Sequence, residues 1–136
     1  MSNPYTGVVA SALRKAQLTL HASESTGEAG SQQALLETAL QEAALVQLWR
    51  AYKAFLAEQG HQLQLGFRPG GEPETAAALS QLVAARGKFS AEANELVNLA
   101  ENPDSWFRAM ESSWQALWQP AQQCAVAPSV RACYDA

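Results

Sequence analysis

Apolar residues recur along this chain at intervals of three and four positions, the spacing that places them on one face of an α-helix. The strongest such segment runs from about Gln32 to Gln59, and its apolar positions cover most of the helix circumference. These positions are Leu35, Leu36, Ala39, Leu40, Ala43, Leu45, Val46, Leu48, Trp49, Tyr52, Phe55 and Leu56. Because a helix that is apolar nearly all round packs on at least two neighbours, we expect it at the centre of the fold. Gly60 is expected to end it as a C-cap glycine with positive φ.

The polar residues of this segment form a narrow strip. Glu42, Arg50 and Lys53 lie close together on the helical projection, with Gln47 and Glu58 beside them. If a second helix covered the strip, its charges would have to be paired. We expect instead that the strip is the side of the helix that faces water.

A shorter helix is predicted before the central one. Asn3-Pro4 is a helix-start signal, since Asn caps free N–H groups and Pro is tolerated at the first helical position. The helix fades in the Ser-, Thr- and Gly-rich segment 22–31. Its apolar stripe is predicted to be Tyr5, Val9, Leu13, Ala16 and Leu20.

The second half of the chain contains shorter helical segments. Residues 60–74 hold four Gly and two Pro, which predicts a long connection between helices. A third helix then runs to Gly87, and Ser90 caps a fourth; the two could also be one helix kinked at Gly87. Asn102-Pro103 repeats the helix-start signal before a last helix that stops before Pro120. The stripe of that helix is Phe107, Met110, Trp114 and Leu117.

Composition supports an all-α fold. The chain has 27 Ala, 16 Leu and 13 Gln but no Ile, so strong helix formers are abundant and β-branched residues are scarce. At 136 residues it is expected to be a single domain, 1–136. We predict a four- to five-helix antiparallel bundle with one long connection. Residues 120–136 are predicted to form a C-terminal strap along the bundle.

Charge and hydropathy exclude several classes of function. The net charge is −4 and the nine Lys and Arg are scattered, which disfavours a dedicated nucleic-acid-binding protein. No apolar stretch approaches the length of a membrane span, and the N-terminus lacks the pattern of a signal peptide, so we expect a cytoplasmic bacterial protein. Cys124 and Cys133 are then expected to be free thiols. A metal site would need two ligands in addition to the cysteines, and His21 and His61 are far from them in sequence, so neither a metal site nor a cofactor is expected.

Catalytic candidates are few. The glycines of segment 66–74 lack the Lys-Ser/Thr of a P-loop, and Glu72 and Glu74 would repel a phosphate. Arg14 and His21, separated by six residues, resemble the Arg-and-His motif of HEPN ribonucleases, which are also helical bundles. That resemblance implies an RNase in which the two side chains assist attack by the RNA 2′-hydroxyl. The alternative is that both are solvent-facing side chains of an amphipathic helix.

The last helix carries an unusual number of aromatic residues. Trp106, Phe107, Trp114 and Trp118 fall within thirteen residues and cannot all point in one direction, so part of this surface is expected to be exposed unless the strap covers it. Core packing is the commoner meaning of such a stripe. A surface for a protein partner or a second copy is the alternative, because Trp dominates the energetics of interfaces.

Three segments resemble an uncharacterised family of short helical proteins from pseudomonad-like Gram-negative bacteria. They are NPYT from Asn3, QEAALVQLWRAYKAFLAE from Gln41 and NPDSWFRAMESSW from Asn102. The resemblance covers the chain except its C-terminal tail. It implies a small cytoplasmic helical protein and supplies no catalytic residues.

The sequence therefore predicts a non-enzymatic helical bundle that acts through protein–protein interaction or self-association, with Trp106, Trp114 and Trp118 as candidate binding residues. The alternative is a HEPN-like RNase that uses Arg14 and His21. A pocket between helices for a small apolar ligand is a third possibility that sequence does not separate from a filled core.

Overall fold

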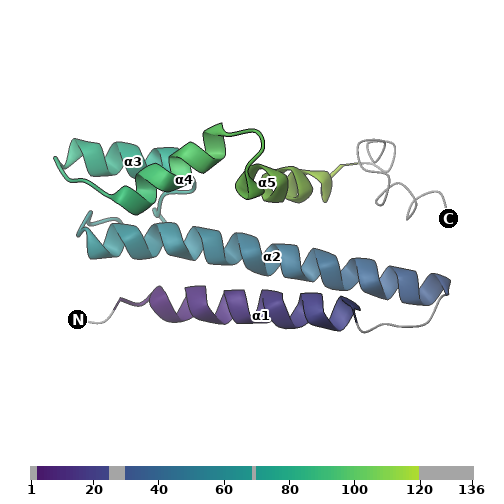
Figure 1. Cartoon of the computed structure of the whole chain (residues 1–136). Coiled ribbons are helices and arrows are strands. Elements are labelled where there is room, and N and C mark those ends of the chain that lie inside the picture. Colours follow the sequence, from purple (N-terminus) through teal and green to yellow (C-terminus); the bar gives the residue numbers. More distant parts are fainter. Residues whose placement is uncertain (1–2, 25–29, 69, 120–136) are drawn as a thin grey trace.

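A computed structural model describes residues 3–24, 30–68 and 70–119 of the chain (Figure 1). Its regular structure is entirely helical within these ranges, which confirms the predicted all-α class. The five helices are α1 (Thr6–Glu24), α2 (Ser31–Gln62), α3 (Ala76–Ala85), α4 (Ala91–Glu101) and α5 (Trp106–Ala116). The predicted strap, together with Cys124 and Cys133, lies outside the described residues.

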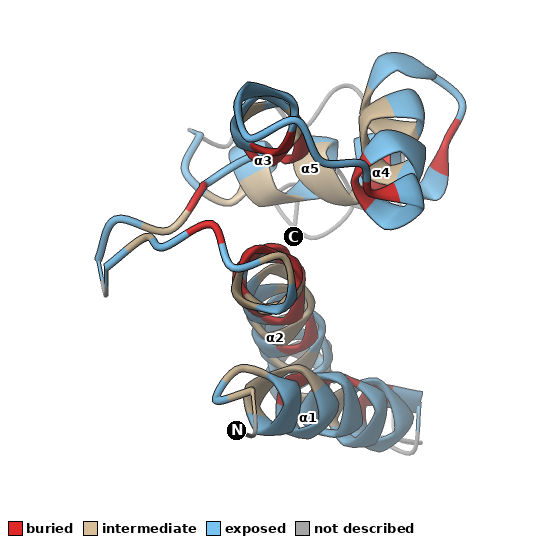
Figure 2. Ribbon diagram, turned by 90° about the vertical axis from the view of Figure 1, so that its left-hand side faces the viewer, coloured by how far each residue is buried: buried red, intermediate tan, exposed pale blue. Residues whose placement is uncertain are grey.

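The long helix α2 separates two layers (Figures 1 and 2). α1 runs antiparallel to α2 along one side, while α3, α4 and α5 form a layer on the other side. Buried residues gather where α2 faces this second layer. The core there consists of Tyr52, Leu56, Leu65, Ala76, Leu79, Val83, Ala93 and Phe107.

Small residues form the contact between α1 and α2. Ala12 and Ala16 are almost fully buried on α1, whereas Leu13 and Leu20 of the predicted stripe are 49% and 41% exposed. On α2, Ala44, Ala51 and Ala54 are buried small residues. The predicted α1 stripe is therefore right in part, since Ala16 is buried and Tyr5 and Val9 are half-buried, and it is wrong at Leu13 and Leu20. Alanines allow two helix axes to approach closely, so large side chains move to the edges of the contact.

The prediction that α2 is central holds for one half of the helix. No residue from 32 to 43 is buried, whereas seven of the ten residues from 51 to 60 are buried. The first turns of α2 extend past the ends of both α1 and α5 (Figure 1). The charged strip faces water as predicted: Glu42, Arg50 and Lys53 are all exposed.

The prediction for Gly60 is wrong. Gly60 lies inside α2, which ends at Gln62 with Leu63 as the C-cap residue. A Cβ at Gly60 would lie 2.0 Å from Cε1 of Phe67, so the glycine is needed for close approach of that ring and not for positive φ. The chain after α2 folds back over the helix end, which places Phe67 there.

The connection from residue 63 to 75 is held by side-chain contacts from distant segments. The Arg86 guanidinium donates a hydrogen bond to the Leu65 carbonyl at 3.0 Å, and the Lys88 ammonium donates to the Leu63 carbonyl. Between α3 and α4 the chain turns at Gly87, whose φ is +65°. Because this left-handed conformation ends α3, the segment is two helices and not one kinked helix.

Both Asn-Pro motifs form turns that precede a helix. The Oδ1 atom of Asn3 accepts a hydrogen bond from the Tyr5 N–H, and Asn102 accepts one from the Asp104 N–H, each at 3.0 Å. The helices themselves begin a few residues later than the motif predicts, at Thr6 and Trp106. None of the described helices combines the length and the apolar character that a membrane crossing requires.

Candidate functional site

A continuous series of aromatic rings joins α5 to α2. The Trp49 and Trp114 rings are stacked with their centroids 5.2 Å apart and their planes 3° apart. Trp118 packs edge-on against Trp114 at 5.8 Å, and Trp49 also stacks on Phe107 at 6.4 Å. Tyr52 contacts both Trp49, at 5.5 Å, and Phe107, at 4.9 Å. We call Trp49, Tyr52, Phe107, Trp114 and Trp118 the aromatic ladder.

The three predicted tryptophans occupy different positions relative to this ladder. Trp114 is half-buried within it, whereas Trp118 at its outer end is 73% exposed. Trp106 lies outside the ladder and is 60% exposed, with its ring edge-on to Phe107 at 6.1 Å. The structure therefore brings Trp114 and Trp118 together and places Trp106 at the opposite end of α5.

Ser105 fixes the position of α5. Its hydroxyl accepts a hydrogen bond from the Arg108 N–H at 3.2 Å, as an N-cap, and donates one to the Leu99 carbonyl at 2.5 Å. The Arg108 guanidinium donates to the Ala100 carbonyl at 3.1 Å. Both side chains thus tie the first turn of α5 to the last turn of α4, which holds Phe107 and Trp114 against α2.

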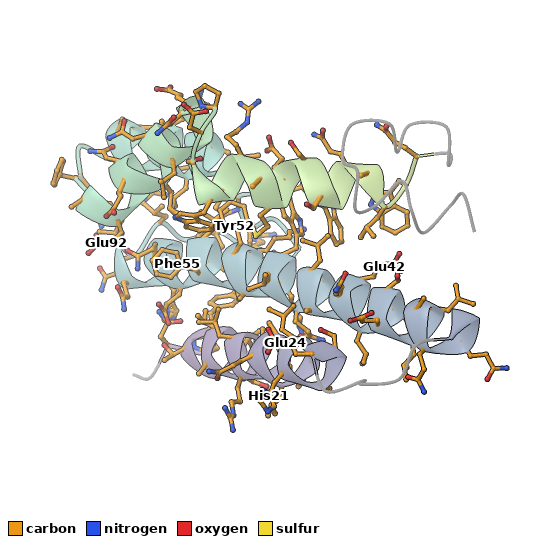
Figure 3. The ribbon with its side chains drawn as sticks, turned by 45° about the vertical axis from the view of Figure 1, so that its right-hand side comes forward. His21, Glu24, Glu42, Tyr52, Phe55 and Glu92 are labelled. Atoms are coloured by element: carbon orange, nitrogen blue, oxygen red, sulfur yellow. The ribbon has the colours of Figure 1, made fainter. Side chains whose placement is uncertain are left out.

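Tyr52 is the buried centre of the ladder (Figure 3). Its hydroxyl oxygen accepts a hydrogen bond from the Ala76 N–H at 3.0 Å, at the start of α3. Burial raises the pKa of Tyr52, and the charge of Glu111 acts in the same direction, while the hydrogen bond from Ala76 acts against them. Tyr52 thereby links α2, α3 and α5.

Sequence reasoning assigned Trp49 and Tyr52 to the central helix but not to the aromatic site. The available signal was their three-residue spacing, which puts both rings on one side of α2. What the sequence did not show was that this side faces α5. Phe107 was expected in the core and is buried there.

Arg14 and His21 lie on α1, two turns apart, and His21 is on the side away from α2 (Figure 3). Both residues are exposed. The Arg14 guanidinium donates a hydrogen bond to the Gln17 side chain at 2.9 Å. The RNase hypothesis requires the two side chains to converge in a cleft, and neither lines the hollow described next.

A hollow of about 400 Å³ lies between the start of α1, the C-terminal half of α2 and the connection to α3. The Tyr5 hydroxyl donates a hydrogen bond to Oε1 of Glu72 at 3.0 Å, and the Gly70 N–H donates to Oε2 at 2.7 Å. Backbone and Tyr5 hydrogen bonds lower the pKa of Glu72, with a smaller effect from Lys53. The residues lining the hollow are Tyr5, Val8, Arg50, Lys53, Ala54, Ala57, Gly70, Glu72, Pro73 and Glu74.

No three His, Cys, Asp or Glu side chains come together as metal ligands in the part of the chain that the structure describes. The described residues thus offer two surface features for function, an exposed aromatic face on α5 and a hollow lined by charged residues.

Together these features define a small all-helical protein in two layers around one long helix. The chain belongs to a family of unknown function (DUF6586), whose model matches residues 7–133. The match includes most of the C-terminal tail, so the expected exclusion of the tail is wrong. No curated protein and no solved structure matches the chain.

Proposed function

We propose that this protein is a non-enzymatic binding module that docks another protein, or a second copy of itself, through the aromatic face of α5. The binding residues are Trp106, Trp114 and Trp118. The observation that carries the proposal is the exposure of two tryptophans, 60% for Trp106 at the start of α5 and 73% for Trp118 just after its end, while Phe107 and Trp114 between them are fixed by stacking.

The physical argument is one of preorganisation. A tryptophan that already packs against a neighbouring ring loses little side-chain entropy when a partner covers its other face. Trp118 rests on Trp114, which rests on Trp49, so the outer ring is supported from the core of the protein. Trp is also the residue most enriched among those that dominate interface energies. The proposed setting is the cytoplasm of a pseudomonad-like bacterium, supported by the sequence resemblance and by the presence of only two cysteines.

The test compares wild type with a Trp106→Ala, Trp118→Ala variant, each shown to be folded by circular dichroism. Phe89→Ala is the matched control, because Phe89 is also 73% exposed but lies between α3 and α4. Sedimentation measures self-association, and pull-down with mass spectrometry identifies partners, which are then purified for measurement of the dissociation constant. We expect a dimer or a purified partner complex that the tryptophan variant weakens and the Phe89 variant does not.

Two results would contradict the proposal. One is that Phe89→Ala weakens self-association or partner binding as much as the tryptophan variant does, which would show nonspecific binding by exposed aromatic groups. The other comes from a chain that ends at Gln119. If removal of residues 120–136 strongly increases quenching of tryptophan fluorescence by acrylamide, those residues occupy the aromatic face themselves.

A further inference from the structure

The hollow at the start of α1 has an apolar floor and a charged rim. Ala54 and Ala57 of α2 and Pro73 of the connection are buried beneath it, and Val8 of α1 is half-buried beside them. Its volume, about 400 Å³, lies within the range of small-molecule sites. The hydrogen bond between Tyr5 and Glu72 joins α1 to the connection and closes one side of the hollow.

The acidic and basic groups on the rim differ in the hydrogen bonds and ion pairs that they make. Each carboxylate oxygen of Glu72 accepts a hydrogen bond, one from Tyr5 and one from Gly70. Arg50 and Lys53 lie one turn apart on α2, and both are exposed. Among the described residues, neither has a carboxylate oxygen within 4.0 Å; the ion pair found there joins Arg108 to Glu111. Among the described residues, two cations therefore border an apolar floor without a close ion pair, although the charge of Lys53 acts at longer range on Glu72.

We propose that this hollow binds a small organic monocarboxylate, with the carboxylate at Arg50 and Lys53 and the hydrocarbon part on the alanine floor. A guanidinium matches a carboxylate through two parallel hydrogen bonds, which a lysine reinforces as a point charge. The acidic side chains of Glu72 and Glu74 line the same hollow and repel a more highly charged anion, so a carboxylate is favoured over inorganic phosphate. This site is separate from the aromatic face of α5.

The test is a titration of the isotope-labelled full chain with sodium benzoate, followed by amide chemical shifts at constant pH and ionic strength. Benzamide, which has the same ring without the charge, and inorganic phosphate are the comparison ligands. We expect saturable shifts with benzoate that centre on Tyr5, Ala54 and Gly70, and weaker binding of both comparison ligands.

The variants are Arg50→Gln and, as a matched control, Arg14→Gln, which removes one exposed arginine from α1. Loss of a charge-assisted hydrogen-bonded pair predicts at least about tenfold weaker benzoate binding in Arg50→Gln and no change in Arg14→Gln. The proposal is overturned if benzoate and benzamide bind equally, if both variants weaken binding equally, or if wild type shows no saturable shifts. Tighter binding of phosphate than of benzoate would also overturn the choice of ligand.

Discussion

The Trp49 and Trp114 rings lie nearly parallel, 5.2 Å apart, and join the middle of α2 to the end of α5. The four other described helices pack around α2, and the stacked pair extends from the core to the exposed end of α5. The stability of the fold and the shape of the proposed binding face therefore depend on the same two side chains.

Replacement of Trp114 by Ala should destabilise the protein. Because Trp114 is half-buried, we expect a loss of about 2–4 kcal/mol in the free energy of unfolding, at or below the range for fully buried Trp. A double-mutant cycle with Trp49→Ala should give a coupling of about 0.5–1.5 kcal/mol beyond the single effects. Urea unfolding followed by circular dichroism measures both. Trp118→Ala is the control, and an equal loss there would contradict this account of the ladder.

The effect of Gly60→Ala on stability should reverse its sign when Phe67 is removed. In wild type, Gly60→Ala places a Cβ 2.0 Å from the Phe67 ring and should cost about 1–3 kcal/mol through overpacking. In a Phe67→Ala background the clash is absent, and the same change should stabilise α2 by up to about 1 kcal/mol, because Ala is a better helix former than Gly. Thermal or urea unfolding of the four proteins measures this. A cost of Gly60→Ala that is the same in both backgrounds would rule out Phe67 as the reason for the glycine.

Tyr52→Phe should leave the Ala76 N–H without its acceptor in a buried position. The expected cost is about 1–3 kcal/mol near neutral pH. The control is Tyr5→Phe, whose hydroxyl contacts the more exposed Glu72, and it should cost less.

The raised pKa of Tyr52 also predicts a dependence of stability on pH. In the unfolded chain the phenol loses its proton near pH 10.0, whereas in the folded protein burial keeps it protonated to higher pH. The unfolded state therefore binds fewer protons in this window, and the free energy of unfolding falls as the pH rises above 10. Urea titrations from pH 8 upward should show a steeper fall in wild type than in Tyr52→Phe. Identical slopes would contradict the assignment.

Arg14→Ala and His21→Ala test the RNase hypothesis. The proposed binding function predicts that purified wild type does not cleave single-stranded RNA and that both variants bind partners as wild type does. Cleavage by wild type that both variants abolish, with melting temperatures unchanged, would instead establish the two residues as a catalytic pair.

The sequence predicts the helices well where periodicity is strong, and it fails where packing between helices decides the outcome. The all-α class, the long connection and the Ser90 cap follow from local signals. The α1 stripe follows only in part, because Leu13 and Leu20 have the larger apolar surface while Ala12, which lies outside the predicted stripe, has the smaller volume that a close helix pair requires.

The aromatic site is also predicted only in part, because local signals show some of it and packing between helices decides the rest. Exposure of some α5 tryptophans follows from their angular spread on a single helix, which the sequence contains. The stacking partner of Trp114 lies 65 positions away, at Trp49, and no local pattern encodes that contact. The charged rim of the hollow likewise forms only when the connection brings Glu72 back to α1. The sequence alone therefore indicates no more for Arg50 and Lys53 than a place on a water-facing strip.

The unequal surroundings of α2 have a consequence for its dynamics. Residues 51–60 are mostly buried between two layers, whereas residues 32–43 include none that is buried. Amide protons in the first group exchange with solvent only through opening of both layers, whereas those in the second group exchange without opening of the layer formed by α3, α4 and α5. One uninterrupted helix should therefore show a steep gradient of hydrogen-exchange protection along its length, with its N-terminal turns opening as an independent unit while its C-terminal turns remain closed.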